Sequence, residues 1–113
     1  MSQPLTYAKI NLDNLISNYR SVRRYAGTEL ICVTKADAYG HGAALCAPAL
    51  YEAGARFFAV ANIAEAVALR ECLPGADDAD IIILGATLPA DAPELIKYNL
   101  IQTLYSFDYA KSL

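Results

Sequence analysis

Short apolar segments alternate with helical segments along almost the whole chain, and this alternation most constrains the fold. Four apolar segments have the length and composition of strands: 30–33, 57–60, 81–84 and 100–104. Helical segments are expected between and after them, at about 43–53, 62–72 and 92–98, and again from Ser106. Strand–helix repeats of this length are typical of βαβ units, whose parallel strands are joined by right-handed crossovers. The sequence therefore predicts an α/β fold with a parallel sheet.

A longer helix is expected before the first of these strands. Its candidate N-cap is Asn11 or Asp13, and Gly27 is suited to the position just after its end. The apolar residues recur at helical spacing, at Leu12, Leu15, Ile16, Tyr19 and Val22. A weakly alternating segment, 5–12, is expected to form a short opening strand ahead of this helix.

Local signals also mark two later helices. Asn62 followed by Glu65 is a capping-box pattern at the start of the helix near 62–72. Pro48 lies inside the helix predicted at 43–53. Because proline lacks a backbone N–H, we expect it to kink or shorten that helix.

Two architectures fit four strand–helix units: a small doubly wound sheet, and part of a (β/α)8 TIM-type barrel. A complete barrel takes roughly 250 residues, so four units of about 25 make half of one. A doubly wound dinucleotide-binding sheet would favour a G-x-G-x-x-G loop after its first strand, and the sequence has none. We therefore predict a partial barrel comprising about the first four βα units.

Composition narrows the class of partner. Hydrophobic residues make up 56% of the 113 residues and charged residues 19%, which excludes a disordered chain. The net charge of −3 and the pI near 4.9 argue against a nucleic-acid partner. The longest uncharged stretch, 38–51, is shorter than the roughly 18 apolar residues of a membrane span, so no membrane partner is expected. Cys32, Cys46 and Cys72 have no CxxC spacing and are expected to be reduced thiols rather than metal ligands.

The segment 35–42, KADAYGHG, carries the residues best suited to chemistry. Lys35 directly follows the first of the four strands, and the carboxyl ends of the strands form the catalytic face of a βα barrel. A lysine amine there can serve as a nucleophile or a proton carrier. From the residues alone, the alternative is a lysine whose amine simply lies in water. We expect Asp37 to be a solvated or turn-capping carboxylate, and His41 to stabilise the turn rather than to catalyse.

This segment, read as V-x-K-A-D-A-Y-G-H-G over 33–42, closely resembles the pyridoxal-phosphate attachment signature of alanine racemases. Weaker matches follow the family in order: L-x-x-N-Y-R at 15–20, EAGA at 52–55, FAVA at 58–61, EAVALR at 65–70 and ILGA at 83–86. The resemblance implies an N-terminal (β/α)8 barrel followed by a C-terminal β-domain. Residues 1–10 would then be a strand belonging with the C-terminal domain, which this chain lacks, and 11–113 the first half of the pyridoxal-phosphate-binding barrel.

The resemblance also implies roles for individual residues. Lys35 would bind pyridoxal 5'-phosphate covalently and then act as the acid/base for the Cα proton of the D-isomer. Tyr39 matches the family tyrosine whose hydroxyl contacts the cofactor phosphate. Val33 and Leu84 match apolar residues that border the cofactor, although packing in a core explains them equally well.

The family's other functional groups have no counterpart in this sequence. The second catalytic base is a tyrosine from the C-terminal domain of the partner subunit, and the arginine at the pyridine nitrogen also comes from later segments. Tyr98, Tyr105 and Tyr109 lie outside any matching motif.

The resemblance therefore implies that the parent protein is a cytoplasmic, homodimeric isomerase that interconverts L-alanine and D-alanine for cell-wall precursor supply. We expect this chain to be its N-terminal fragment and to be inactive alone. Two alternatives stay open: a broad-specificity or serine racemase of the same family, and a non-catalytic half-barrel fragment.

Overall fold

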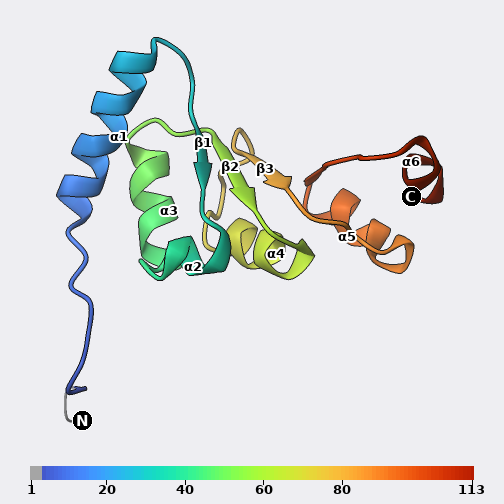
Figure 1. Cartoon of the computed structure of the whole chain (residues 1–113), viewed down its shortest axis with the longest axis horizontal. Helices are drawn as coiled ribbons and strands as arrows, with labels where there is room; N and C mark the ends of the chain where they lie inside the picture. The colour runs from blue at the N-terminus through green and yellow to red at the C-terminus, as the bar shows by residue number, and fades with distance from the viewer. Residues whose placement is uncertain (1–3) are drawn as a thin grey trace.

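A computed structural model describes residues 4–113 as one parallel sheet with its main helices packed along one face (Figure 1). The first half contains α1 (Leu12–Ala26), β1 (Ile31–Val33), α2 (Lys35–Tyr39), α3 (Ala43–Glu52) and β2 (Phe57–Val60). The second half contains α4 (Ile63–Glu71), β3 (Asp80–Ile83), the 3-10 helix η1 (Pro89–Asp91), α5 (Ala92–Lys97), β4 (Ile101–Gln102) and α6 (Phe107–Ser112). Over 4–113, no helix combines the length and the apolar character needed to cross a membrane.

The strands pair in the order in which they occur along the chain. β1 pairs with β2, β2 with β3 and β3 with β4, and all three pairs are parallel. A doubly wound sheet reverses its strand order at one point, whereas a barrel adds each strand beside the preceding one. The observed order therefore confirms the partial barrel and excludes the doubly wound alternative.

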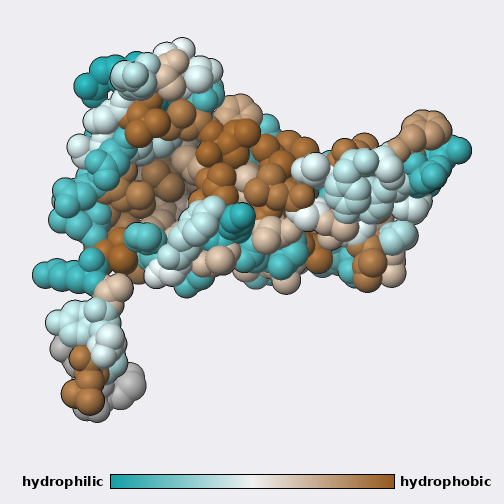
Figure 2. All heavy atoms as spheres, viewed as in Figure 1, coloured by the Kyte–Doolittle hydropathy of each residue, from teal (hydrophilic) through white to brown (hydrophobic). Residues whose placement is uncertain are grey.

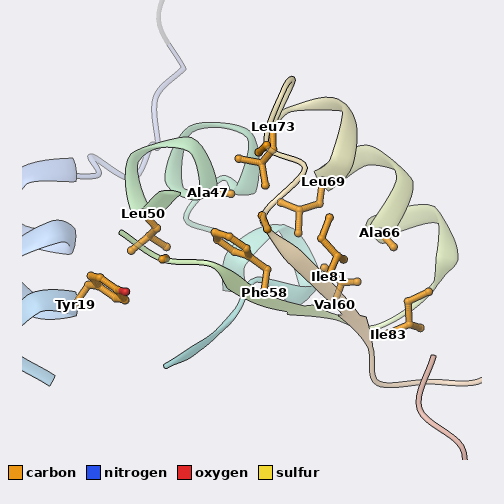
Figure 3. Close-up of a cluster of buried hydrophobic side chains, with 13 residues drawn as sticks. Tyr19, Ala47, Leu50, Phe58, Val60, Ala66, Leu69, Leu73, Ile81 and Ile83 are labelled. Atoms are coloured by element: carbon orange, nitrogen blue, oxygen red, sulfur yellow. The ribbon is translucent and has the colours of Figure 1, made fainter. Parts of the chain in front are cut away.

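One face of the sheet carries the buried core. Alternate residues of β2 and β3 point to this face, because side chains in a strand alternate with period two. Phe58, Ile81 and Ile83 have no exposed surface and Val60 is 1% exposed. Figure 3 shows these side chains lying between the sheet and helices α3 and α4, which contribute Ala47, Leu50, Ala66 and Leu69.

The opposite face is open over residues 4–113. Ile31 is 55% exposed, Val33 40% and Ile101 44%, and hydrophobic side chains gather over β1–β3 on the face seen in Figure 2. The uninterrupted apolar run at 30–33 suggests a strand covered on both sides, and for the described residues that interpretation is wrong. The physical reason is that β1 is an edge strand and the described helices cover only one face of the sheet.

Helix ends follow the local signals closely. Asn11, not Asp13, is the N-cap of α1, because its Oδ1 accepts the Asn14 N–H at 3.0 Å. Gly27 ends α1 in the left-handed conformation with φ of 67°. Pro48 does not shorten α3, which continues to Glu52.

Residues 4–11 run away from the body of the molecule without forming a strand (Figure 1). An isolated segment cannot form a strand, because its backbone groups need a neighbouring strand to hydrogen-bond. The assignment of residues 1–10 to a C-terminal β-domain stays a prediction, and residues 1–3 lie outside the described part.

Candidate functional site

The chain between β1 and α3 adopts a left-handed helical turn. Ala36, Asp37 and Ala38 have φ between 52° and 56° and ψ between 45° and 49°, Tyr39 has φ of 56°, and Gly40 has φ of 84°. Hydrogen bonds close the turn, with the Ala38 N–H donating to Thr34 O at 3.0 Å and the Gly40 N–H to Ala36 O at 3.1 Å. Left-handed backbone costs an L-residue about 1–2 kcal/mol, so four consecutive non-glycine residues need support from their surroundings.

Two side chains of the turn supply part of that support. Asp37 Oδ1 accepts the N–H of Ala43, the first residue of α3, at 2.9 Å. His41 Nδ1 lies 2.9 Å from Ala38 O, which makes Nδ1 the protonated nitrogen since a carbonyl oxygen can only accept. Asp37 therefore joins the turn to the first residue of α3, which agrees with the expected turn-capping carboxylate, and His41 holds the end of the turn, as expected.

A third support comes from another strand–helix unit. Glu65, in the first turn of α4, accepts the N–H of Ala36 with Oε2 at 2.8 Å and the N–H of Ala61 with Oε1 at 2.7 Å. The Asn62 side chain caps α4 by accepting the Glu65 N–H at 2.9 Å, as expected. The returning bond of a capping box would go to the Asn62 N–H. In this structure the Glu65 carboxylate instead accepts the N–H of Ala61 and the N–H of Ala36, the residue after Lys35.

Lys35 begins the turn at the carboxyl end of β1. Its Nζ lies 5.9 Å from the centre of the Tyr39 ring, within the range of a cation–π contact. Tyr39 itself is 60% exposed, so it is not a packed core aromatic among residues 4–113. The turn therefore gathers a primary amine and a phenol at the edge where barrel enzymes carry their chemistry.

Val33 and Leu84 lie on the open face near the same edge. The register pairs Val33 with Ala59 and Ala59 with Ile82, which places these residues on one face, and Leu84 comes two residues after Ile82. Leu84 is 45% exposed. Neither Val33 nor Leu84 belongs to the buried core of the described residues, and both leave apolar surface beside the turn.

The nearby thiols are poor nucleophiles. Burial raises the pKa of Cys32 to about 11. Burial, with a smaller contribution from the charge of Asp37, raises the pKa of Cys46, whose Sγ contacts His41 O at 3.6 Å. A thiol with a raised pKa is mostly protonated near neutral pH and reacts slowly. These thiols are therefore poor candidates for a nucleophile at this edge.

Sequence reasoning missed the handedness of the turn, the double contact of Glu65 and a close approach at Gly85. The Gly85 N–H donates to Ala61 O at 3.0 Å, and a Cβ at Gly85 would lie 2.5 Å from that oxygen. The signals available were a glutamate at the capping-box position and a glycine directly after the third of the four predicted strands. Neither signal identifies a partner distant in the sequence.

Comparisons with known proteins point to one family. Residues 10–113 match the family model for the alanine racemase N-terminal domain. The alanine racemase of Clostridium novyi is 45% identical over 108 residues, which cover 95% of this chain and 27% of that protein. The chain thus spans about a quarter of the length of the curated relatives it matches.

Solved structures show the same likeness. An alanine racemase from Bartonella henselae with covalently bound pyridoxal phosphate has a TM-score of 0.82 and 36% identity, covering 90% of this chain and 28% of that one. A histidine racemase from Leuconostoc mesenteroides has a TM-score of 0.80 and 25% identity, covering 89% and 27%. Because the family model matches residues 10–113, this chain belongs to the alanine racemase N-terminal domain family.

Proposed function

We propose that this chain is the N-terminal part of a pyridoxal-phosphate-dependent alanine racemase, in which Lys35 binds the cofactor covalently. The observation that carries the proposal is the position of Lys35 at the carboxyl end of β1, inside a segment that resembles the family's attachment signature. The covalently bound pyridoxal phosphate of the Bartonella henselae relative supports it.

The residues at this edge fit such a cofactor chemically. A primary amine is the group that condenses with an aldehyde, and Lys35 supplies one on a turn held from three directions. The Tyr39 hydroxyl would donate to the cofactor phosphate, and Val33 and Leu84 offer exposed apolar surface for an aromatic ring. When bound, pyridoxal phosphate supplies an electron sink that stabilises negative charge at the substrate Cα.

Lys35 would then move a proton at the substrate Cα. A lysine amine removes a proton when neutral and returns it when charged, so one side chain can serve as base and acid on one face of the substrate. For the D-isomer, Lys35 is the group we assign. The Tyr39 ring beside Nζ would limit the positions that the flexible lysine chain can occupy.

A racemase needs a second proton carrier on the opposite face of Cα, and we propose that it lies outside this chain. Tyr109 has a phenol that could in principle carry a proton. Its hydroxyl already bonds to the backbone of Thr87, accepting the N–H at 2.7 Å and donating to the carbonyl at 2.8 Å. Tyr105 stacks on Tyr109, with ring centres 4.8 Å apart. We propose that the partner subunit of a cytoplasmic homodimer supplies the second group, and that the product feeds cell-wall precursors.

A second candidate substrate deserves a test. The histidine racemase from Leuconostoc mesenteroides matches this chain at a TM-score of 0.80, so this half of the barrel is compatible with more than one amino acid. Nothing among residues 4–113 points to a substrate side-chain pocket that would exclude serine or a broader range. The proposal of alanine therefore rests on the alanine racemases among the relatives.

The test is a chiral assay on the complete protein and on residues 1–113 alone. The complete protein, given pyridoxal phosphate and L-alanine, should form D-alanine faster than it forms D-serine or D-histidine from their L-isomers. Residues 1–113 should be inactive and should self-associate in light scattering, because the unpaired edges and the exposed apolar face favour association. A monodisperse monomer of 1–113 that racemises alanine would contradict the proposal, and faster turnover of another amino acid would correct the substrate.

A further inference from the structure

We propose that Glu65 is a positioning residue for Lys35, acting through the peptide bond that joins Lys35 to Ala36. This inference rests on the proposed function of Lys35 and assigns to Glu65 a part in it. Glu65 does not act on a substrate or cofactor in this proposal. Its carboxylate fixes the backbone from which the lysine side chain extends.

The contact joins two neighbouring strand–helix units. Glu65 and Ala36 are 29 residues apart in sequence, and the carboxylate bridges the N–H that follows Lys35 to the Ala61 N–H that follows β2. Both distances, 2.8 Å and 2.7 Å, are short for N–H···O bonds, as expected for a charged acceptor. Each oxygen accepts one backbone N–H, so both bonds are kept only while the two strand ends hold their relative position.

The bond to Ala36 controls the orientation of Lys35. The Ala36 N–H lies in the same planar peptide unit as the Lys35 carbonyl. Holding that N–H therefore holds ψ of Lys35 and the entry into the left-handed turn, whose next three residues all have positive φ. Ala36 is exposed, so water would compete for its N–H if the carboxylate were absent.

The bond to Ala61 gives the carboxylate a fixed reference. Ala61 follows β2, the strand with the most completely buried residues, and its carbonyl is held at 3.0 Å by the Gly85 N–H. The Ala61 N–H is thus held by Glu65 and the Ala61 carbonyl by Gly85. Through these two bonds, Glu65 ties the end of β1, where Lys35 lies, to the well-packed end of β2.

Glutamine tests this role because it has the shape of glutamate but only one acceptor oxygen. In Glu65→Gln, the amide NH2 would face one of the two backbone N–H groups, so one bond must be lost. Glu71→Gln is the matched control. Glu71 lies on the same helix and is exposed, and its side chain makes no hydrogen bond within residues 4–113.

The experiment uses the complete racemase that contains this chain, stripped of cofactor and then mixed with pyridoxal phosphate well below the melting temperature of each variant. The readouts are the rate at which the visible absorbance of lysine-bound pyridoxal phosphate develops, the melting temperature before addition, and kcat and KM for alanine. We expect Glu65→Gln to slow attachment about tenfold or more and to lower kcat rather than raise KM. Glu71→Gln should stay within twofold of the unmodified protein.

The outcomes separate the two proposals. A folded Glu65→Gln variant that melts lower but attaches pyridoxal phosphate and turns over at the unmodified rate would show a merely structural role and overturn the inference. Absence of attachment in the unmodified protein and in Glu71→Gln would overturn the proposed function, and the inference with it.

A second measurement needs no variant. In the unmodified protein, the Ala36 amide should exchange its hydrogen slowly although the residue is exposed, because Glu65 holds it. Exchange as fast as that of an unbonded exposed amide would overturn the inference, including in the case that Glu65→Gln fails to fold.

Discussion

The connections that leave β1 and β2 differ sharply, although both join a strand of the same parallel sheet to a helix. After β2, the chain passes through Ala61 and enters α4 with Asn62 as an ordinary N-cap. After β1, residues 36–39 take up left-handed backbone before α3 begins. The first connection follows standard capping rules, and the second violates the usual conformational preference of L-residues.

The difference coincides with the position of the proposed active site. The strained connection carries Lys35 and Tyr39, and strained backbone is found mainly where surrounding structure holds a functional group in place. The ordinary connection provides that holding through Glu65, which belongs to α4 and reaches Ala36. The two connections are therefore linked by the hydrogen bond between Ala36 and Glu65. Variants can alter each connection separately.

The largest loss of activity is expected when the amine of Lys35, in the strained connection, is replaced. Lys35→Arg keeps a positive charge but removes a group that can give up its proton, because arginine stays charged in proteins. Racemisation by the complete protein should fall by about 10³-fold or more. Lys97→Arg, an exposed position on α5, should leave the rate within twofold. Comparable losses in both variants would show that Lys35 has no special role.

A smaller effect is expected where the ordinary connection meets β3. Gly85→Ala would place a Cβ 2.5 Å from Ala61 O and displace the backbone that Glu65 holds. Its free energy of unfolding should fall by about 1–3 kcal/mol, and pyridoxal phosphate should attach more slowly.

Gly75→Ala is the control for this variant. Gly75 has φ of 75° and no atom near its missing Cβ, so alanine there adds strain without touching Ala61. In urea denaturation it should also lose stability, by about 1–2 kcal/mol, while attachment stays normal. If pyridoxal phosphate attached at the same rate to Gly85→Ala and Gly75→Ala, the proposed link between the two connections would be contradicted.

The smallest expected effect is on the free energy of unfolding when alanine is replaced by glycine. Its sign should differ between the left-handed turn and α4. At exposed Ala36, glycine relieves about 1–2 kcal/mol of left-handed strain and loses about 0.4–1 kcal/mol to unfolded-state entropy. Ala36→Gly should therefore stabilise the complete protein by about 0.8 kcal/mol, the difference between the midpoints of these two ranges. Ala68→Gly, in the right-handed α4, should destabilise it by about 0.5–1 kcal/mol. Urea midpoints measure both, and the same sign in both variants would contradict the left-handed geometry.

The contrast also explains how much of this molecule is predictable from its sequence. The four strands of the sheet, their order and the caps at Asn62 and Ser106 depend on residues close in the chain, and they occur as predicted. The opening strand predicted at 5–12 does not form among the described residues, and of the two candidate caps of α1 the structure uses Asn11. For residues 35–42 the sequence predicts only a turn, without its handedness. One of the groups that hold this turn is Glu65, 29 residues from Ala36, and local patterns carry no information about such a partner.

The exposure of β1 has a similar cause. An apolar run such as Ile31–Val33 indicates that a strand can be buried, but burial requires a second layer of structure. Residues 4–113 provide that layer on one face only, so Ile31 and Val33 are exposed. The site residues themselves, Lys35 and Tyr39, came from the signature rather than from periodicity, and their roles stay predictions.

The most direct test of the central claim is to identify the lysine that binds pyridoxal phosphate. The complete protein, loaded with pyridoxal phosphate, is reduced with sodium borohydride, digested and mapped by mass spectrometry. A pyridoxyl group on Lys35 is the predicted result. A pyridoxyl group on Lys9, Lys97 or Lys111 instead, with Lys35 unmodified, would contradict the assignment of the strained connection as the active site.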